Sequence, residues 1–265
     1  MSVRGDVFEM FREQLEYREL LWQITVRDLL LRYKQTVMGF GWAVFMPLIN
    51  TAVFTVIFTR VTQVRTPVAY PLFAYSGFLF WNFFAASLRF AVPSLTSNTN
   101  LVQKIYFPRE IFPFSAMLVC LVDLLVGSLV LVGFMIYYRV GVGTSVVYLP
   151  LVVAVNLLFT AGVALLLAMA NLFFRDVKYL FEALITVWMF ASAVVYPIDT
   201  MQGRLGGLLA VNPMTQIIEA YRQVLLYGRA PEFGGFGVAA AASAVILVAS
   251  WYGFHKAEFA FAENI

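Results

Sequence analysis

The stretch RDLLLRYKQTVMGFGWAVFMPL, residues 27–48, passes within a few positions from a charged, amphipathic segment to an unbroken apolar run. Gly39 and Gly41 lie at the junction. A cluster of Arg and Lys directly against an apolar segment is typical of a helix that begins at the cytoplasmic headgroups of a membrane. The two glycines would allow the chain to turn from lying along the membrane to crossing it.

The composition of the whole chain indicates an integral membrane protein. Of its 265 residues, 62% are hydrophobic and 12% are charged, and the mean hydropathy is +0.82. A soluble domain has about 25% charged residues. The net charge of +3 is the kind of excess that orients a membrane protein, so we expect no nucleic-acid partner. Cys120 is the sole cysteine, which excludes an intrachain disulfide.

Six segments are long and apolar enough to cross a bilayer, which takes about 20 residues. They cover residues 39–58, 71–92, 112–138, 146–174, 179–197 and 238–254. Because lipid offers the backbone no hydrogen-bond partners and no barrel-like alternation occurs, we expect an all-α fold with six transmembrane helices. The chain would be a single permease domain over 1–265, with an interface helix over 1–38, a membrane domain over 39–254 and a cytoplasmic tail over 255–265.

The distribution of basic residues predicts the orientation of these spans. Eleven Lys and Arg residues fall on the side that holds both termini, and six fall on the opposite side. Basic residues accumulate on the cytoplasmic side of membrane proteins. We therefore expect both termini in the cytoplasm and multi-pass insertion in the membrane.

The segment before the first apolar run predicts a helix that lies in the membrane interface. Its apolar residues recur at steps of three, four and seven. They are Phe8, Phe11, Leu15, Trp22, Val26, Leu29 and Tyr33. One apolar face on an otherwise charged helix is typical of interfacial helices, which bind membrane lipids. The basic residues Arg27, Arg32 and Lys34 would lie at headgroup height, although they could equally serve topology alone.

Two connecting segments predict helices that do not cross the membrane. The loop PSLTSNTNLVQKIYFPREIFP, residues 93–113, has helix-start residues before Leu101 and a helix-ending Pro108. It predicts a short cytoplasmic helix that docks on a partner, with an ordinary loop as the alternative. The segment 204–228 has helical apolar spacing broken at Asn212–Pro213, and predicts a re-entrant helical hairpin before the last span.

No pattern in the sequence indicates catalysis. A phosphate loop of the G-x-x-x-x-G-K-[ST] type is absent, and His255, the single histidine, has no second histidine or nearby cysteine with which to share a zinc ion. We therefore expect no catalytic residue, cofactor or metal on this chain. Asp123 and Glu182 are acidic residues within apolar segments. A proton-driven carrier would use such groups, but we favour a hydrogen bond from Asp123 to a neighbouring helix.

Aromatic residues make up 17% of the chain and are dense in the second apolar segment. Aromatic rings pack cores and anchor helices at membrane interfaces. Their faces can also stack on the apolar faces of sugar rings, which would suit a conduit for a long glycan. Packing and anchoring remain the alternative for each individual ring.

Four segments together resemble the membrane subunit of the polysaccharide-exporting ATP-binding cassette transporters, which belong to the ABC-2 type permeases. They are RDLLLRYKQTVMGFGWAVFMPL (27–48), NTNLVQKIYFPREIFP (98–113), NLFFRDVKYLFEALITVWMFASAVVYPI (171–198) and NPMTQIIEAYRQVLLYG (212–228). The resemblance implies a homodimer joined to two separate ATP-binding cassette subunits, which would hold ATP and Mg²⁺. It implies export of an undecaprenyl-diphosphate-linked polysaccharide, most often O-antigen, across the bacterial inner membrane.

The resemblance also implies roles for particular residues. Arg27, Arg32 and Lys34 would attract the lipid diphosphate. The ATPase coupling segment would include Asn100, Leu101, Val102, Lys104, Phe107, Arg109 and Glu110. The channel would be lined by Trp42, Phe45, Tyr75, Phe78 and Trp81. The outer gate would include Asn212, Pro213, Glu219, Tyr221 and Arg222.

Several alternatives remain open at this point. Within the same family, the substrate could be teichoic acid, capsule, a drug or a small lipid. A membrane enzyme that transfers lipid-linked glycans would need paired carboxylates or a metal cluster at one membrane face, and the sequence suggests neither. A secondary carrier would depend on an ion gradient and not on ATP.

Overall fold

The computed structural model describes residues 12–34, 36, 38–61, 66–104, 107–198 and 204–264, and within these residues every regular element is a helix. The helices are α2 (Arg18–Tyr33), α3 (Gly41–Val56), α4 (Tyr70–Ala91), α5 (Ser94–Ser97), α6 (Thr99–Lys104), α7 (Ile111–Tyr137), α8 (Leu149–Phe173), α9 (Val177–Phe190), α10 (Arg204–Val211), α11 (Pro213–Leu225) and α12 (Phe233–Asn264). A π-helical turn, Ile57–Val61, extends α3, and a 3₁₀ turn, Thr144–Tyr148, precedes α8. The expected all-α class is confirmed.

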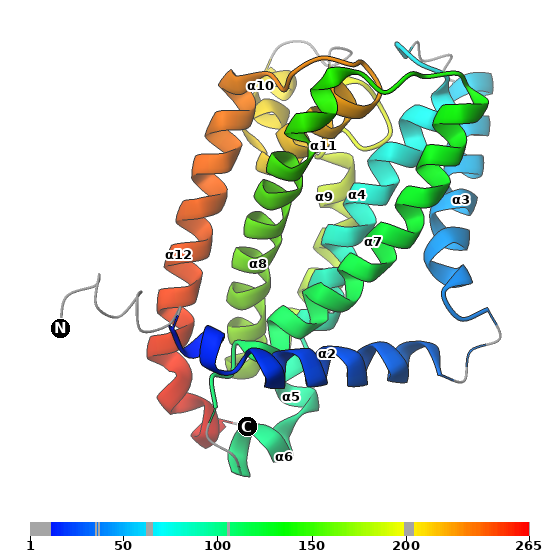
Figure 1. Ribbon diagram of the computed structural model, residues 1–265. Coiled ribbons are helices and arrows are strands. Elements are labelled where there is room, and N and C mark those ends of the chain that lie inside the picture. Colours follow the sequence, from blue (N-terminus) through cyan, green and yellow to red (C-terminus); the bar gives the residue numbers. More distant parts are fainter. Residues whose placement is uncertain are drawn as a thin grey trace.

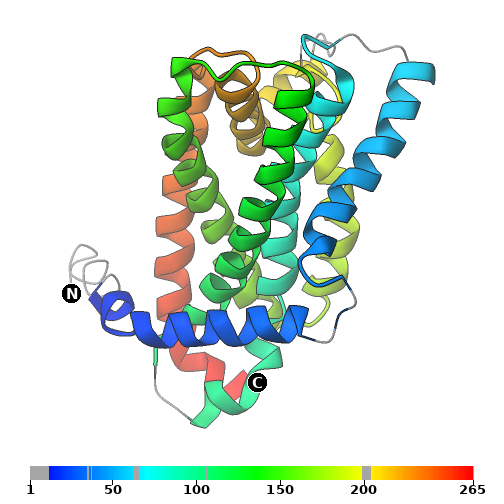
Figure 2. The same ribbon diagram turned by 45° about the vertical axis from the view of Figure 1, so that its right-hand side comes forward.

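The long helices form one bundle with distinct structures at its two ends. Helices α3, α4, α7, α8, α9 and α12 run along a common direction, and α2 lies across one end, nearly perpendicular to them (Figures 1 and 2). The short helices α5 and α6 lie at the same end as α2 (Figure 1). Helices α10 and α11 lie at the opposite end (Figure 1). The bundle therefore has one end with the short helices of the predicted coupling segment and another with the broken hairpin.

Among the described residues, four helices are long and apolar enough to cross a membrane: Gly41–Arg60, Ile111–Tyr137, Thr144–Phe173 and Phe233–Glu258. They correspond to four of the six predicted spans. The other two predicted spans form α4 and α9, and whether these cross the bilayer stays a prediction. The predicted span 179–197 extends beyond the C-terminal end of the helix, because α9 ends at Phe190 and an irregular segment follows.

The core of the bundle is built around α4. Most residues of α4 are buried on all sides, including Leu72, Phe73 and Phe84, which have no exposed surface. Helix α7 packs along α4, and α8 packs along both α4 and α12. Helix α3 is different, because only 11% of its apolar, membrane-spanning stretch is buried against the rest of the chain. Its apolar side chains therefore face lipid or another protein.

The turn between α2 and α3 uses the glycine that the sequence singles out. Gly39 has φ +50°, a left-handed conformation that other residues adopt only with strain. Helix α2 faces the bundle with Ile24 and Thr25, neither of which belongs to the predicted apolar stripe. Trp22, a stripe residue, is 68% exposed. The first third of the predicted interface helix, residues 1–11, lies outside the described residues.

Helices α8 and α12 approach closely at Gly162. A Cβ added there would lie 2.8 Å from the Leu247 backbone nitrogen. Gly162→Ala should therefore force the two helices apart and lower the free energy of unfolding by about 1–3 kcal/mol. Thermal unfolding of the purified protein measures this change. Gly133→Ala is the matched control, because nothing lies within 4 Å of its added Cβ; equal losses in both variants would contradict the assignment.

Candidate functional site

An ion pair fixes helix α2 across α7. The Arg32 Nη2 atom lies 2.8 Å from Asp123 Oδ2. The Tyr33 hydroxyl donates to the other carboxylate oxygen of Asp123, and the Ser115 hydroxyl lies 3.2 Å from Asp28 Oδ2. The interpretation of Asp123 as a residue that bonds to a neighbouring helix is therefore confirmed, although its partner is the interface helix and not another span.

The three residues predicted to attract a lipid diphosphate have different surroundings. Arg32 is engaged by Asp123, and its guanidinium also lies 4.4 Å from the centre of the Phe90 ring. Arg27 lies 2.8 Å from Asp28 Oδ1 and donates to Asn98 at 3.1 Å. Lys34, at the end of α2, is exposed. Of the three, Lys34 is therefore the most accessible to an anion.

A cavity of about 350 Å³ opens beside the Arg32–Asp123 pair, between α2, α3, α4 and α7. Its wall is mostly apolar and includes Trp42, Met46 and Leu124. Burial and the Asp123 carboxylate raise the pKa of the Tyr33 phenol, so its hydroxyl remains a hydrogen-bond donor at neutral pH. The cavity therefore combines an apolar wall with one fixed polar corner, the arrangement typical of small-molecule sites.

The acidic residue Glu182 has a partner of its own. Its Oε2 atom lies 3.3 Å from Arg89 Nε, and both side chains are about half exposed. An ion pair at such an exposed position contributes little stability. Neither Glu182 nor Asp123 is therefore left as an isolated buried carboxylate, the group that proton-driven transport requires.

The predicted coupling segment forms a short helix, α6, with α5 before it. Asn100 on α6 is exposed, and Leu101 is half-buried. Val102, Phe107 and Glu110 are at most 4% exposed. These three residues hold the segment against the bundle and offer no surface to a partner in this conformation. The side chain of Lys104 lies outside the described residues.

Arg109 ties the coupling segment to the end of α12. Its backbone N–H donates to Glu258 Oε1 at 3.1 Å, and its guanidinium donates to the Glu258 carbonyl. The same guanidinium donates to the Val102 carbonyl at 3.2 Å. These bonds attach the segment to α12, and the side chains of Arg109 and Glu258 that form them are largely buried.

The predicted channel-lining aromatics divide into two groups. Trp42 and Phe45, on α3, are 41% and 40% exposed. Tyr75, Phe78 and Trp81, on α4, are at most 3% exposed and pack inside the bundle. The α4 residues cannot touch a substrate while the helices keep this arrangement, because other helices cover them. The assignment of a channel surface to either group stays a prediction.

Asn212 and Pro213 break the outer segment as the sequence predicts. The Asn212 side chain accepts from the Met214 N–H at 3.1 Å, which caps α11, and Pro213 occupies its first turn. The Asn212 amide also donates to the Ala191 carbonyl at 2.8 Å. One side chain therefore starts α11 and joins it to the end of α9.

Arg222, on α11 of the hairpin, is buried. It donates to the carbonyls of Ala193 and Val194 at 3.0 and 2.6 Å, and its guanidinium lies 3.6 Å from the centre of the Phe73 ring. The Glu219 carboxylate lies 3.8 Å from Arg222. Tyr221 stacks on Phe80 with ring centroids 3.4 Å apart. These predicted gate residues therefore anchor the hairpin to the irregular segment after α9 and to α4.

Two features escaped the sequence interpretation. Gly77 lies so close to Arg222 that an added Cβ would be 2.5 Å from its Nη2 atom, and no local pattern marks that contact. The second is the surroundings of His255, for which the sequence predicts no metal-binding partner. In the fold Glu110 and Glu258 lie beside it, and the His-x-x-Glu spacing of 255–258 was the available signal.

The fold and these sites define a class, an all-helical integral membrane protein with a helix across one end of its bundle and no nucleotide-binding loop in its sequence. The chain belongs to the ABC-2 type transporter family, whose model matches residues 19–226. It is 30% identical to the O-antigen export system permease protein RfbA of Myxococcus xanthus over 98% of this chain and 100% of that protein. It is 28% identical to the Klebsiella pneumoniae protein of the same name over 79% of this chain and 81% of that protein.

The Arg32–Asp123 pair should stabilise the attachment of α2 measurably. A double-mutant cycle of Arg32→Met and Asp123→Asn should give a coupling free energy of about 1–3 kcal/mol, because both side chains are largely buried. The same cycle on the exposed pair, Arg89→Met and Glu182→Gln, should give less than about 1 kcal/mol. Equilibrium unfolding in mixed micelles measures both. Equal coupling in the two cycles would show that the first pair is not a structural attachment.

Proposed function

We propose that this chain is the membrane-spanning subunit of an ATP-driven exporter that moves lipid-linked polysaccharide, with O-antigen as the leading substrate, across the bacterial inner membrane. The observation that carries the proposal is the full-length similarity to a protein named as an O-antigen export permease. ATP and Mg²⁺ would be held by two partner ATPase subunits. The chain itself would be a transport subunit without a catalytic site.

The proposed membrane arrangement has six spans, with α4 and α9 as the two beyond the four long apolar helices. Both termini would be cytoplasmic, and α10 with α11 would form a re-entrant hairpin in the outer leaflet. The bundle supports this arrangement, because α2, α5 and α6 share one end and the hairpin lies at the other (Figure 1). The exposed apolar surface of α3 supports a homodimer, whose two copies would enclose the channel.

The proposed mechanism uses contacts at both ends of the bundle. Closure of the ATPase subunits would press on α6, and the links through Arg109 and Glu258 would carry the movement to α12. The lipid diphosphate would approach the cytoplasmic end near Lys34, beside the apolar cavity. The glycan would follow along exposed aromatic rings such as Trp42 and Phe45. Movement of the hairpin held by Asn212 and Arg222 would open the exit.

Co-purification with a partner ATP-binding cassette subunit from the same organism tests the proposal. ATP hydrolysis by the complex in lipid should rise severalfold when undecaprenyl-linked glycan is added, because the substrate favours the closed transport state. Undecaprenyl phosphate without glycan is the control and should stimulate less. A chain that binds no ATPase would contradict the whole proposal. A complex stimulated equally by drugs or simple lipids would contradict the glycan assignment alone.

Lys34→Gln tests the entry site. A basic group near an anionic surface contributes about 1 kcal/mol, so the variant should need about fivefold more lipid-linked glycan for half-maximal ATPase stimulation. Lys34→Arg should retain the wild-type response. Arg18→Gln, at the other end of α2 and also exposed, is the control and should leave the response unchanged. Identical responses of Lys34→Gln and wild type would remove Lys34 from the entry site.

A further inference from the structure

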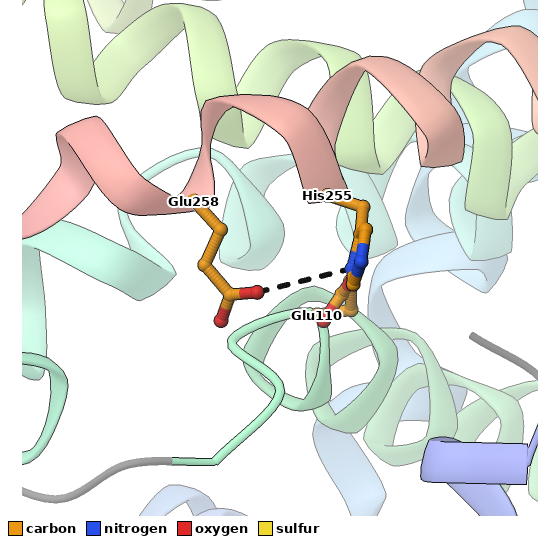
Figure 3. A group of neighbouring side chains, drawn as sticks. All are labelled: Glu110, His255 and Glu258. Carbon is orange, nitrogen blue, oxygen red and sulfur yellow. Dashed lines mark ion pairs between the residues drawn. The ribbon is translucent and has the colours of Figure 1, made fainter. Parts of the chain in front are cut away.

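Three side chains that could bind a metal meet where the coupling segment joins α12. His255 and Glu258 are one turn apart on α12, and Glu110 immediately precedes α7 (Figure 3). One ligand atom from each lies within 4.8 Å of the others. The His255 Nδ1 atom is 3.6 Å from Glu110 Oε1 and 3.9 Å from Glu258 Oε2.

The bonding of this cluster is incomplete within the chain. The Glu110 side chain is only 1% exposed, and its Oε2 atom has no hydrogen-bond partner among the described residues. The Nδ1 atom of His255 likewise has none, because both carboxylates lie beyond hydrogen-bond distance. A buried carboxylate oxygen without a partner is costly. Glu258 already has Arg109 Nε 4.0 Å from its Oε1 atom, so the atoms that still lack a partner are Glu110 Oε2 and His255 Nδ1. A bound cation would supply that partner.

The spacing of the donor atoms suits a small divalent cation. Zinc takes imidazole nitrogen and carboxylate oxygen at about 2.0–2.2 Å in a tetrahedron, which places two ligand atoms about 3.3–3.5 Å apart. The observed separations of 3.6 and 3.9 Å need contraction by only a few tenths of an ångström. The side chains of His255 and Glu258 are 27% and 15% exposed, so an ion and a water as fourth ligand have access from solvent.

Neighbouring groups orient the ligands. The Arg109 N–H donates to Glu258 Oε1, which leaves Oε2 turned toward His255. Contacts of this kind hold metal ligands in place. The positive charge of Arg109 opposes a cation, and its Nε atom lies 4.0 Å from Glu258 Oε1. Its terminal nitrogens donate to the carbonyls of Glu258 and Val102, and the Glu258 oxygen that faces His255 is the other one, Oε2. Glu13 adds negative charge near His255.

We propose that Glu110, His255 and Glu258 form a binding site for a zinc-class divalent cation, which clamps the coupling segment to α12. The ion would neutralise both carboxylates and replace the two long contacts of His255 by coordination bonds. Since Glu110 and His255 belong to segments far apart in sequence, binding would stiffen the path from the coupling segment to the last helix. This inference stands apart from the identity of the transported substrate.

Zinc occupancy of the full-length chain tests the proposal. The protein is purified with an affinity tag free of histidine, because His255 is the only histidine in the sequence. It is stripped with EDTA, dialysed against zinc sulfate, and analysed for metal by mass spectrometry. We expect about one tightly held zinc ion per chain and a higher midpoint of thermal unfolding with zinc, since a ligand that binds only the folded state stabilises it.

Variants assign the bound ion to the cluster. His255→Gln and Glu110→Gln should lose the zinc and its thermal shift, whereas Glu182→Gln, an acidic residue on another helix, should retain both. Failure of the wild type to retain zinc would overturn the proposal and leave an ion-pair cluster. Equal zinc in wild type and His255→Gln would overturn it as well. The wild-type measurement does not depend on any variant folding, and because no transport is assayed, its failure is distinct from failure of the export function.

Discussion

A charged side chain inside an apolar helix bundle needs a partner, and this constraint determines how the irregular parts of the chain are attached. Transfer of an unpaired charge out of water costs several kcal/mol, which no single apolar contact offsets. Asp123 is therefore joined to Arg32 of the interface helix, and Arg222 to carbonyls after α9. The interface helix and the outer hairpin are thereby each held at a defined place on the bundle.

These attachments lie at opposite ends of the bundle. At the end with α2, the coupling segment is tied to α12 through Arg109 and Glu258. At the other end, Asn212 joins α11 to α9. Long helices such as α12 connect the two ends as rigid elements, because their backbone hydrogen bonds form within the helix. The predicted coupling segment and the α10–α11 hairpin are therefore attached to the same rigid helices.

The aromatic residues illustrate how burial limits a functional interpretation. A ring that stacks on a sugar and a ring that fills a core are the same side chain in different surroundings. Tyr75, Phe78 and Trp81 are covered by neighbouring helices, whereas Trp42 and Phe45 on the weakly covered α3 are not. Access of a glycan to the surface of α3 needs no rearrangement within the chain. Access to the α4 rings requires that the helices separate.

The sequence by itself determined what depends on local physics. Apolar length indicated the membrane helices, Gly39 marked the turn into α3, and Asn212–Pro213 marked the break in the outer segment. These signals depend on residues a few positions apart, so they can be recognised in the sequence. Only the tertiary structure decided that Asp123 faces Arg32, that three α4 aromatics are buried, and that His255 meets Glu110. These contacts and this burial involve helices that are far apart in the sequence. They depend on how the helices pack and rotate against one another, and the spacing of residues within one segment does not encode that.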